Sequence, residues 1–137
     1  MIIGQIKDGI VLDHITTGKA MEIYNVLNLS KLDCTVALIK NADSTKKGKK
    51  DIIKISTLLD LDLDILGYLD PGITVNVIRD HQVAERRHLE LPQRVVGVIK
   101  CKNPRCITSV EREITHEFRL TDPDKKIYRC IYCEQKA

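Results

Sequence analysis

Four cysteines near the C-terminus constrain the fold more than any other feature of the sequence. Cys101, Cys106, Cys130 and Cys133 form the pattern C-x4-C followed by C-x2-C, with 23 residues between the two halves. Two short cysteine loops can hold one zinc ion tetrahedrally, with each sulfur about 2.3 Å from the metal. Because four thiolates leave no coordination position for water, the pattern predicts one structural zinc ion per chain.

Two disulfides, or unrelated buried cysteines, are the alternatives to zinc. Residues 93–137 contain too few apolar side chains for an independent core, and domains of this size usually need a metal or a cross-link. The N-terminus lacks a basic region followed by a long apolar stretch, so we expect a cytoplasmic chain, in which disulfides are rare. Both observations favour zinc. Cys34, which stands apart, is expected to be a small buried residue.

Composition narrows the classes of partner. No apolar run approaches the roughly 20 residues that span a bilayer, so no membrane partner is expected. Residues 1–92 carry 12 Lys and Arg against 13 Asp and Glu, and residues 93–137 carry 10 against 6. Four thiolates and one zinc ion would lower the positive charge of the tail by two. This balance gives little reason to expect DNA or RNA as the main partner.

The N-terminal part shows the order β-α-β-β-α-β. Apolar alternation and β-branched residues predict strands, the first of them bent at Asp8-Gly9, and apolar residues at helical spacing predict the helices. Thr16 or Thr17 is the expected cap of the first helix and Thr57 that of the second. The expected strands cover residues 1–15, 33–40, 51–56 and 73–78, a turn covers 41–48, and the helices cover 17–28 and 58–69.

This order predicts an α+β chain with a ferredoxin-like split βαβ (βαββαβ) domain, whose two helices cover one face of an antiparallel sheet. The polar, basic stretch 85–93, with Pro92, indicates a boundary between domains 1–90 and 91–137. Strands are expected over 94–100, 114–120 and 126–129. They would form a small all-β, zinc-bound (rubredoxin-like) domain.

Several polar residues of the first domain can converge on one edge of its sheet. Asp13 and His14 end the first strand, and Lys50, Ile52 and Lys54 share one face of the third. Asn76 lies inside the last strand, where an amide needs a partner, and the cluster at Arg86 follows. A carboxylate can accept bonds from ribose hydroxyls, and the cations can neutralise phosphates. Solvated strand ends and a solvated lysine face are the alternative interpretations.

Several parts of the sequence resemble one known family. They are the runs Gly9–Ile15, Gly48–Ile55 and Thr74–Asn76, the pair Leu91-Pro92 and the cysteine spacing. All of them are similar to the regulatory chain of aspartate carbamoyltransferase. The resemblance covers nearly the whole chain in order. It implies a non-catalytic subunit whose N-terminal domain binds nucleotides, with CTP inhibiting, often with UTP, and ATP activating. It also implies a zinc domain that contacts the catalytic chain of this enzyme of pyrimidine biosynthesis, and pairing with another regulatory chain through the N-terminal domains.

By matching position, the resemblance places Asp13 and Lys54 at the ribose and base, His14 at the phosphates and Lys50 beside them. Arg86 stands where the family pattern has a lysine, and His81 where it has a tyrosine. Gly4 and Gln5 also depart from the family's first strand. The remaining residues expected to line the nucleotide pocket are Ile6, Val11, Ile52, Asn76, Ile78 and Val83.

Two other functions are weighed against this one. A stand-alone enzyme would need a nucleophile–base pair, paired carboxylates or an open metal site, and the sequence suggests none of them. A small zinc-ribbon nucleic-acid-binding protein would suit the basic tail. However, the tail lacks the Phe/Tyr-rich strands and the recognition helix of such proteins.

Overall fold

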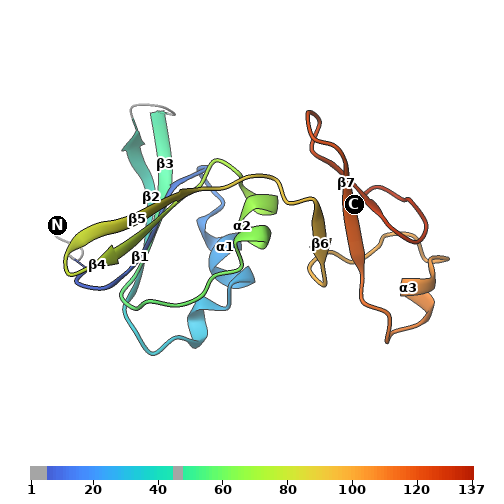
Figure 1. The fold of residues 1–137 in the computed structure, drawn as a ribbon, viewed down its shortest axis with the longest axis horizontal. Coiled ribbons are helices and arrows are strands. Elements are labelled where there is room, and N and C mark those ends of the chain that lie inside the picture. The colour runs from blue at the N-terminus through green and yellow to red at the C-terminus, as the bar shows by residue number, and fades with distance from the viewer. Residues whose placement is uncertain (1–5, 45–47) are drawn as a thin grey trace. The chain divides into compact units, whose positions relative to one another are not determined.

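The structure is a computed structural model that describes residues 6–44 and 48–137. The chain divides into two compact units, Met1–Leu89 and Glu90–Ala137 (Figure 1). The start of the first predicted strand, with Gly4 and Gln5, lies outside the described residues, as does the centre of the predicted turn at 45–47.

The N-terminal unit contains a five-stranded antiparallel sheet in the order β2-β3-β1-β4-β5. This order contains the predicted split βαβ arrangement, with one further strand at the edge. The elements are β1 (Gly9–Ile15), α1 (Ala20–Val26), the 3-10 turn η1 (Leu29–Lys31), β2 (Val36–Ser44), β3 (Gly48–Ile55), α2 (Leu63–Leu69), β4 (Thr74–Arg79) and β5 (Gln82–His88).

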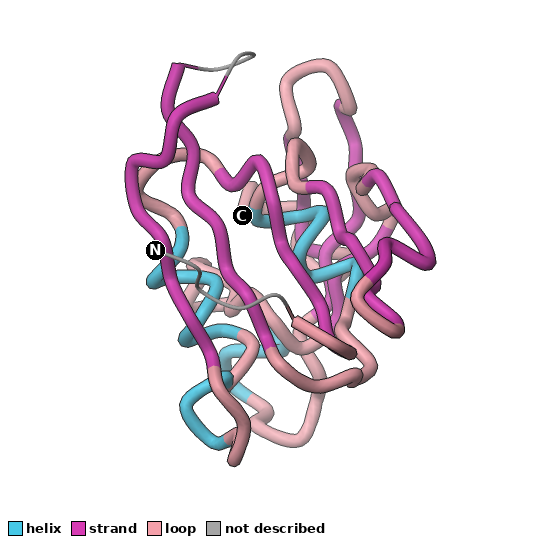
Figure 2. The backbone as a smooth tube through the Cα atoms, turned by 90° about the vertical axis from the view of Figure 1, so that its left-hand side faces the viewer, coloured by secondary structure: helices cyan, strands magenta, loops and turns pink. Residues whose placement is uncertain are grey.

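Both helices cover the same face of this sheet, as predicted (Figures 1 and 2). Ile23 of α1 and Leu66 of α2 have no exposed surface and pack against apolar side chains that the strands send to that face. No helix of the described residues lies on the other face of the sheet, and Figure 2 looks onto that face. The strand residues of the core are Ile10, Leu12, Ile15, Ile53, Ile55 and Val75.

Of the stretch 85–93, in which the domain boundary was predicted, the first four residues belong to strand β5, and the two units meet after Leu89. All seven side chains of β5 are exposed, so the strand shows no apolar alternation. Its backbone pairs with β4 from Thr74↔His88 to Arg79↔Gln82. Backbone hydrogen bonds to a neighbouring strand therefore form this edge strand without a buried face of its own.

The predicted helix caps were wrong. Helix α1 begins after Lys19 and receives no side-chain cap. Helix α2 begins only at Leu63, where the Asp62 carboxylate accepts bonds from the N–H groups of Asp64 (3.0 Å) and Ile65 (3.2 Å). Residues 58–62 are irregular, because a better cap lies five residues after Thr57.

A distant carboxylate serves the first turn of α1 instead. Asp51, which has no exposed surface, accepts bonds through Oδ2 from the N–H groups of Gly18 (3.0 Å) and Ala20 (3.4 Å). Its Oδ1 accepts a bond from the N–H of Asn41 (3.1 Å), which lies at an irregularity in the β2–β3 pairing. One buried side chain on β3 thus joins helix α1 to strand β2.

The C-terminal unit has a three-stranded sheet in the order β6-β7-β8. Strand β6 (Arg94–Val96) is shorter than predicted because Gly97, at φ 72°, turns the chain. A single helical turn, α3 (Ile107–Val110), was not predicted; β7 (Glu117–Asp122) and β8 (Ile127–Cys130) follow. The small core consists mainly of Val95, Phe118, Leu120 and Tyr128.

Replacing Asp51 with Asn should destabilise the N-terminal unit by about 3 kcal/mol, because an amide cannot accept bonds from all three N–H groups. Urea unfolding followed by circular dichroism measures the change. Asp33→Asn, at an exposed position, is the matched control and should change stability by less than about 0.5 kcal/mol. Equal unfolding midpoints for the two variants would contradict the role assigned to Asp51.

Candidate functional site

The two cysteine pairs meet in the C-terminal unit. The four sulfur atoms of Cys101, Cys106, Cys130 and Cys133 all lie within 4.8 Å of one another. The Sγ atoms of Cys101 and Cys133 are 3.5 Å apart, and those of Cys106 and Cys130 are 3.7 Å apart. Four sulfurs at about 2.3 Å from one tetrahedral ion lie about 3.8 Å from each other. The geometry therefore suits one zinc ion, and the sulfur separations are too long for disulfides.

The surroundings of the sulfurs shift the pKa values of the thiols in opposite directions. The Thr108 hydroxyl, 3.1 Å from the sulfur of Cys106, lowers the pKa of that thiol to about 6. Burial raises the pKa of Cys101 to about 12 and also raises the pKa of Cys130. Four neighbouring thiolates repel one another, and a divalent cation makes their joint ionisation favourable. The donor set fits a closed structural zinc site.

Local structure positions the ligands. Cys106 directly precedes α3, Cys130 ends β8, and the N–H of Cys101 donates to Nδ1 of His116 at 3.0 Å. All five cysteines are free thiols, and Cys34 is half-buried against the N-terminal core, far along the chain from the cluster.

The open face of the N-terminal sheet brings several predicted site residues into one row. Val11 of β1 is paired with Lys54 of β3 on one side and with Asn76 of β4 on the other. Asn76 is paired with Arg86 of β5, whose Nε donates to the Asn76 Oδ1 at 2.9 Å. Because side chains alternate along strands, this row points away from the core that the helices cover.

Asp13 and His14 both lie off the core face because β1 is irregular between Leu12 and Ile15. Leu12 and Ile15 are fully buried although they are three residues apart, and His14 between them has φ 59°. This β-bulge turns two consecutive polar residues away from the core. Nδ1 of His14 lies 3.2 Å from the Thr74 hydroxyl, a contact that the sequence analysis missed and that β4 alternation with Asn76 could have indicated.

Asp13 forms an ion pair with Lys50, with 2.9 Å between Oδ1 and Nζ, and both side chains are largely shielded from solvent. Burial opposes ionisation of Asp13, but the hydrogen bonds from Lys50 and from the His14 N–H outweigh it and lower the pKa. The carboxylate is therefore ionised at neutral pH and can accept further hydrogen bonds.

The other predicted site residues lie around this face. Ile52 is half-buried between the two lysines, and Ile78 is half-buried and paired with Val83, which is 51% exposed. Ile6 lies beside Gly9, where an added Cβ would come within 2.7 Å of its Cγ2. His81 lies in the exposed β4–β5 turn, and its N–H donates to the Lys7 carbonyl.

Comparisons with known proteins decide the family. The profile of the aspartate carbamoyltransferase regulatory chain, allosteric domain, matches residues 1–90, and that of the metal-binding domain matches residues 93–137. The chain belongs to the aspartate carbamoyltransferase regulatory chain family. It is 52% identical over 136 residues to the regulatory chain of Clostridium tetani, covering 98% of this chain and 94% of that one.

Other regulatory chains of the family agree along the whole length. Identity is 50% to that of Clostridium acetobutylicum, over 98% of this chain and 92% of the relative. It is 40% to that of Bifidobacterium longum, over 100% and 99% respectively. The metal-binding domain and the cysteine cluster together agree with the predicted structural zinc. Among the described residues, no helix is long and apolar enough to cross a membrane.

The purified chain should contain one zinc ion, as measured by elemental analysis. Cys130→Ser should weaken zinc binding by at least about 100-fold, because even the loss of a residue that only supports a ligand costs 10- to 100-fold. Cys34→Ser removes a thiol outside the cluster and should retain the metal. If both variants kept zinc equally, the cysteine cluster would not be the metal site.

Proposed function

We propose that this chain is a non-catalytic subunit that binds nucleotides on the open face of its N-terminal sheet and acts through its zinc domain on a catalytic chain of aspartate carbamoyltransferase. CTP, with UTP, inhibits and ATP activates. The complex works in the cytoplasm, where thiols such as the five free cysteines stay reduced, and serves pyrimidine biosynthesis.

The nucleotide proposal rests on one observation, the row of paired residues across the open face. This row consists of Lys54, Val11, Asn76 and Arg86, with Asp13 and Lys50 beside it. A nucleoside triphosphate combines a flat base, ribose hydroxyls and several negative charges. Asp13 supplies hydrogen-bond acceptors for the hydroxyls, and apolar side chains such as Val11 and Ile78 lie beside them. Lys50 and Arg86, with His14, supply positive charge for the phosphates, and Lys54 lies with Asp13 at the ribose and base. The guanidinium of Arg86 is held in place by Asn76.

The expected mechanism is thermodynamic linkage. A nucleotide that binds one quaternary state more tightly shifts the equilibrium toward that state, by no more than its difference in affinity. Allosteric couplings are typically about 1–3 kcal/mol. The N-terminal unit also pairs with a second regulatory chain. Its edge strands β2 and β5 offer backbone groups for this, because each has a neighbouring strand on only one side among the described residues.

The zinc domain presents a charged face suited to an acidic surface of the catalytic chain. Arg94, Arg119 and Arg129 are paired directly across β6, β7 and β8 on the face opposite the small core. Like charges side by side in a sheet are destabilising, and an acidic partner would relieve that repulsion. Within the described residues only Arg94 of the three has a carboxylate partner, Glu117 at 3.3 Å. A cleft of about 470 Å³ lies over this row.

Exposed apolar residues around the cysteine loops add a second kind of contact to this proposed docking surface. Ile107 and Val110 of α3 are 45% and 64% exposed, and Ile131 and Tyr132, between two of the cysteines, are 42% and 48% exposed. Apolar and aromatic side chains of this kind are typical anchors of protein interfaces. Zinc would keep them rigid.

Replacing Arg86 with Gln should weaken CTP binding about tenfold, because a charge-assisted hydrogen bond to a phosphate is lost. Arg87→Gln is the matched control: Arg87 is the next residue of β5 but faces the other side of the sheet, so binding should change by less than about twofold. Isothermal titration measures both. Equal affinities of the two variants would remove this face as the nucleotide site.

Replacing Arg119 with Glu should weaken association with the catalytic chain at least about tenfold, since a cation at the centre of the proposed docking surface becomes an anion. Arg112→Glu makes the same charge change at an exposed loop position outside the row. Sedimentation with purified catalytic chains measures the difference.

Removal of zinc with a mercurial should release both variants, and intact assembly after complete zinc loss would contradict the role given to the zinc domain.

A further inference from the structure

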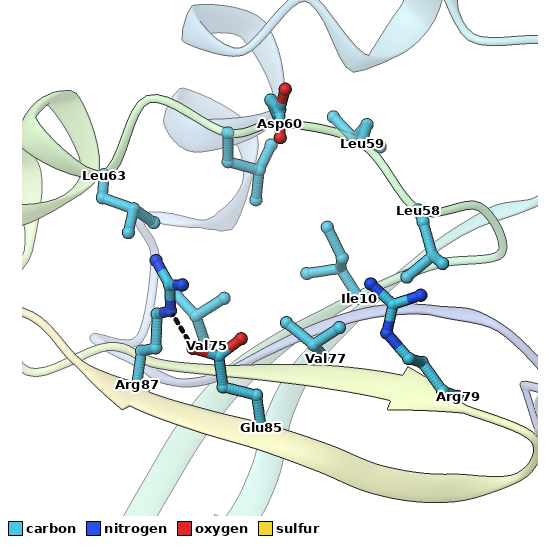
Figure 3. A pocket seen from close by; sticks show the side chains of 11 residues that line it. Ile10, Leu58, Leu59, Asp60, Leu63, Val75, Val77, Arg79, Glu85 and Arg87 are labelled. Carbon is cyan, nitrogen blue, oxygen red and sulfur yellow. Dashed lines mark hydrogen bonds and ion pairs between the residues drawn. The ribbon is translucent and has the colours of Figure 1, made fainter.

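A cleft of about 410 Å³ lies on the helix-covered side of the N-terminal sheet, away from the proposed nucleotide face (Figure 3). Its floor is formed by β1, β4 and β5, and its roof is the irregular segment 58–62 together with Leu63, the first residue of α2. The roof is mainly aliphatic, with Leu58, Leu59, Leu61 and Leu63 beside Asp60. The floor is mixed: Ile10, Val75 and Val77 lie at its centre, and the other lining residues, Arg79, Glu85 and Arg87, are charged.

Charged groups lie at the two ends of this cleft. Figure 3 shows the side chain of Arg87 rising from β5 toward Leu63 and that of Arg79 rising from β4 toward Leu58. Arg87 is paired with Glu85. Among the described residues, the side chain of Arg79 forms no ion pair, and Asp60, on the roof, forms none with either arginine. At the Arg79 end of the cleft, no carboxylate of the described residues forms an ion pair with this positive charge.

We propose that this cleft binds a small amphiphilic carboxylate. Its aliphatic or flat apolar body lies between the leucines of the roof and the valines of the floor, and its carboxylate pairs with the Arg79 guanidinium. The planar fork of an arginine matches a carboxylate through two parallel hydrogen bonds. The volume is within the range of small-molecule sites, which are largely apolar with few polar groups.

The walls select against more polar ligands. A nucleoside triphosphate would bring several negative charges next to Glu85 and Asp60 and would lose hydration against aliphatic side chains. A ligand with a single negative charge can place that charge at the Arg79 guanidinium, at the opposite end of the cleft from the Arg87–Glu85 ion pair. The chemistry of the cleft thus differs from that of the open face, where Lys50, Lys54 and Arg86 gather.

Strand alternation separates this cleft from the proposed nucleotide face although both use the same two strands. On β4, Val75, Val77 and Arg79 point to the cleft, whereas Asn76 points to the open face. On β5, Glu85 and Arg87 line the cleft, and Arg86 bonds to Asn76. Substitutions in the cleft therefore leave the side chains of the other face in place, and the two proposals can fail independently.

The test is a titration of the full zinc-loaded chain with octanoate, followed by two-dimensional amide NMR. Octanoate should give saturable shifts for residues 58–63 and for β4. Octan-1-ol and octan-1-amine, which share the apolar body but lack the carboxylate, should bind at least about fivefold more weakly. Arg79→Gln should weaken octanoate about fivefold and leave octan-1-ol unchanged, while Arg112→Gln should change neither.

A second variant tests the apolar part of the cleft. Val77→Phe fills the floor and should reduce octanoate binding, with an unchanged spectrum elsewhere showing that the unit remains folded. Absence of saturable octanoate shifts at the cleft would overturn the proposal. Equal binding of octan-1-ol and octanoate would also overturn it, and would assign the cleft to an apolar partner segment instead.

Discussion

The alternation of side chains along the strands of one sheet is the constraint on which the N-terminal unit depends. Ile10, Leu12, Ile53, Ile55 and Val75 project to one side and form the core with the two helices. The intervening residues must then project to the other side, which no helix in the described part of the chain covers. The same backbone therefore determines both the stability of the unit and the composition of the open face. A one-residue change of register in a strand would move its core residues to the open face and its open-face residues to the core.

Side-chain alternation is interrupted at two places near the proposed nucleotide site, in β1 and in β2. The bulge at Asp13 and His14 places both side chains off the core face, and Ile15 then returns to the core. Opposite this bulge, Ile15 is paired with Asp51, whose carboxylate binds the first turn of α1 and the irregular part of β2. Asp51 thus holds the backbone next to the Asp13–Lys50 ion pair, without facing the ligand side of the sheet.

The order of elements was predictable because the apolar residues of β1, β3 and β4 alternate or cluster in short runs. Strand β5 could not be found in this way, because an edge strand with seven exposed side chains needs only the backbone of β4. The helix caps were misplaced because the acceptor for the first turn of α1 is Asp51, about thirty residues away in sequence. The row of Lys54, Val11, Asn76 and Arg86 on the open face depends on the register in which the strands pair, and this register is known only from the folded sheet.

The zinc domain meets a different physical requirement from the N-terminal sheet. Its core is small, so the four thiolates must contribute much of the stability that apolar burial cannot provide. Cys130 ends β8, one residue after Arg129, so a metal bound there also restrains the strand that carries the outer arginine of the row. A closed coordination shell is thus suited to holding the three arginines of the row in register on the proposed docking surface.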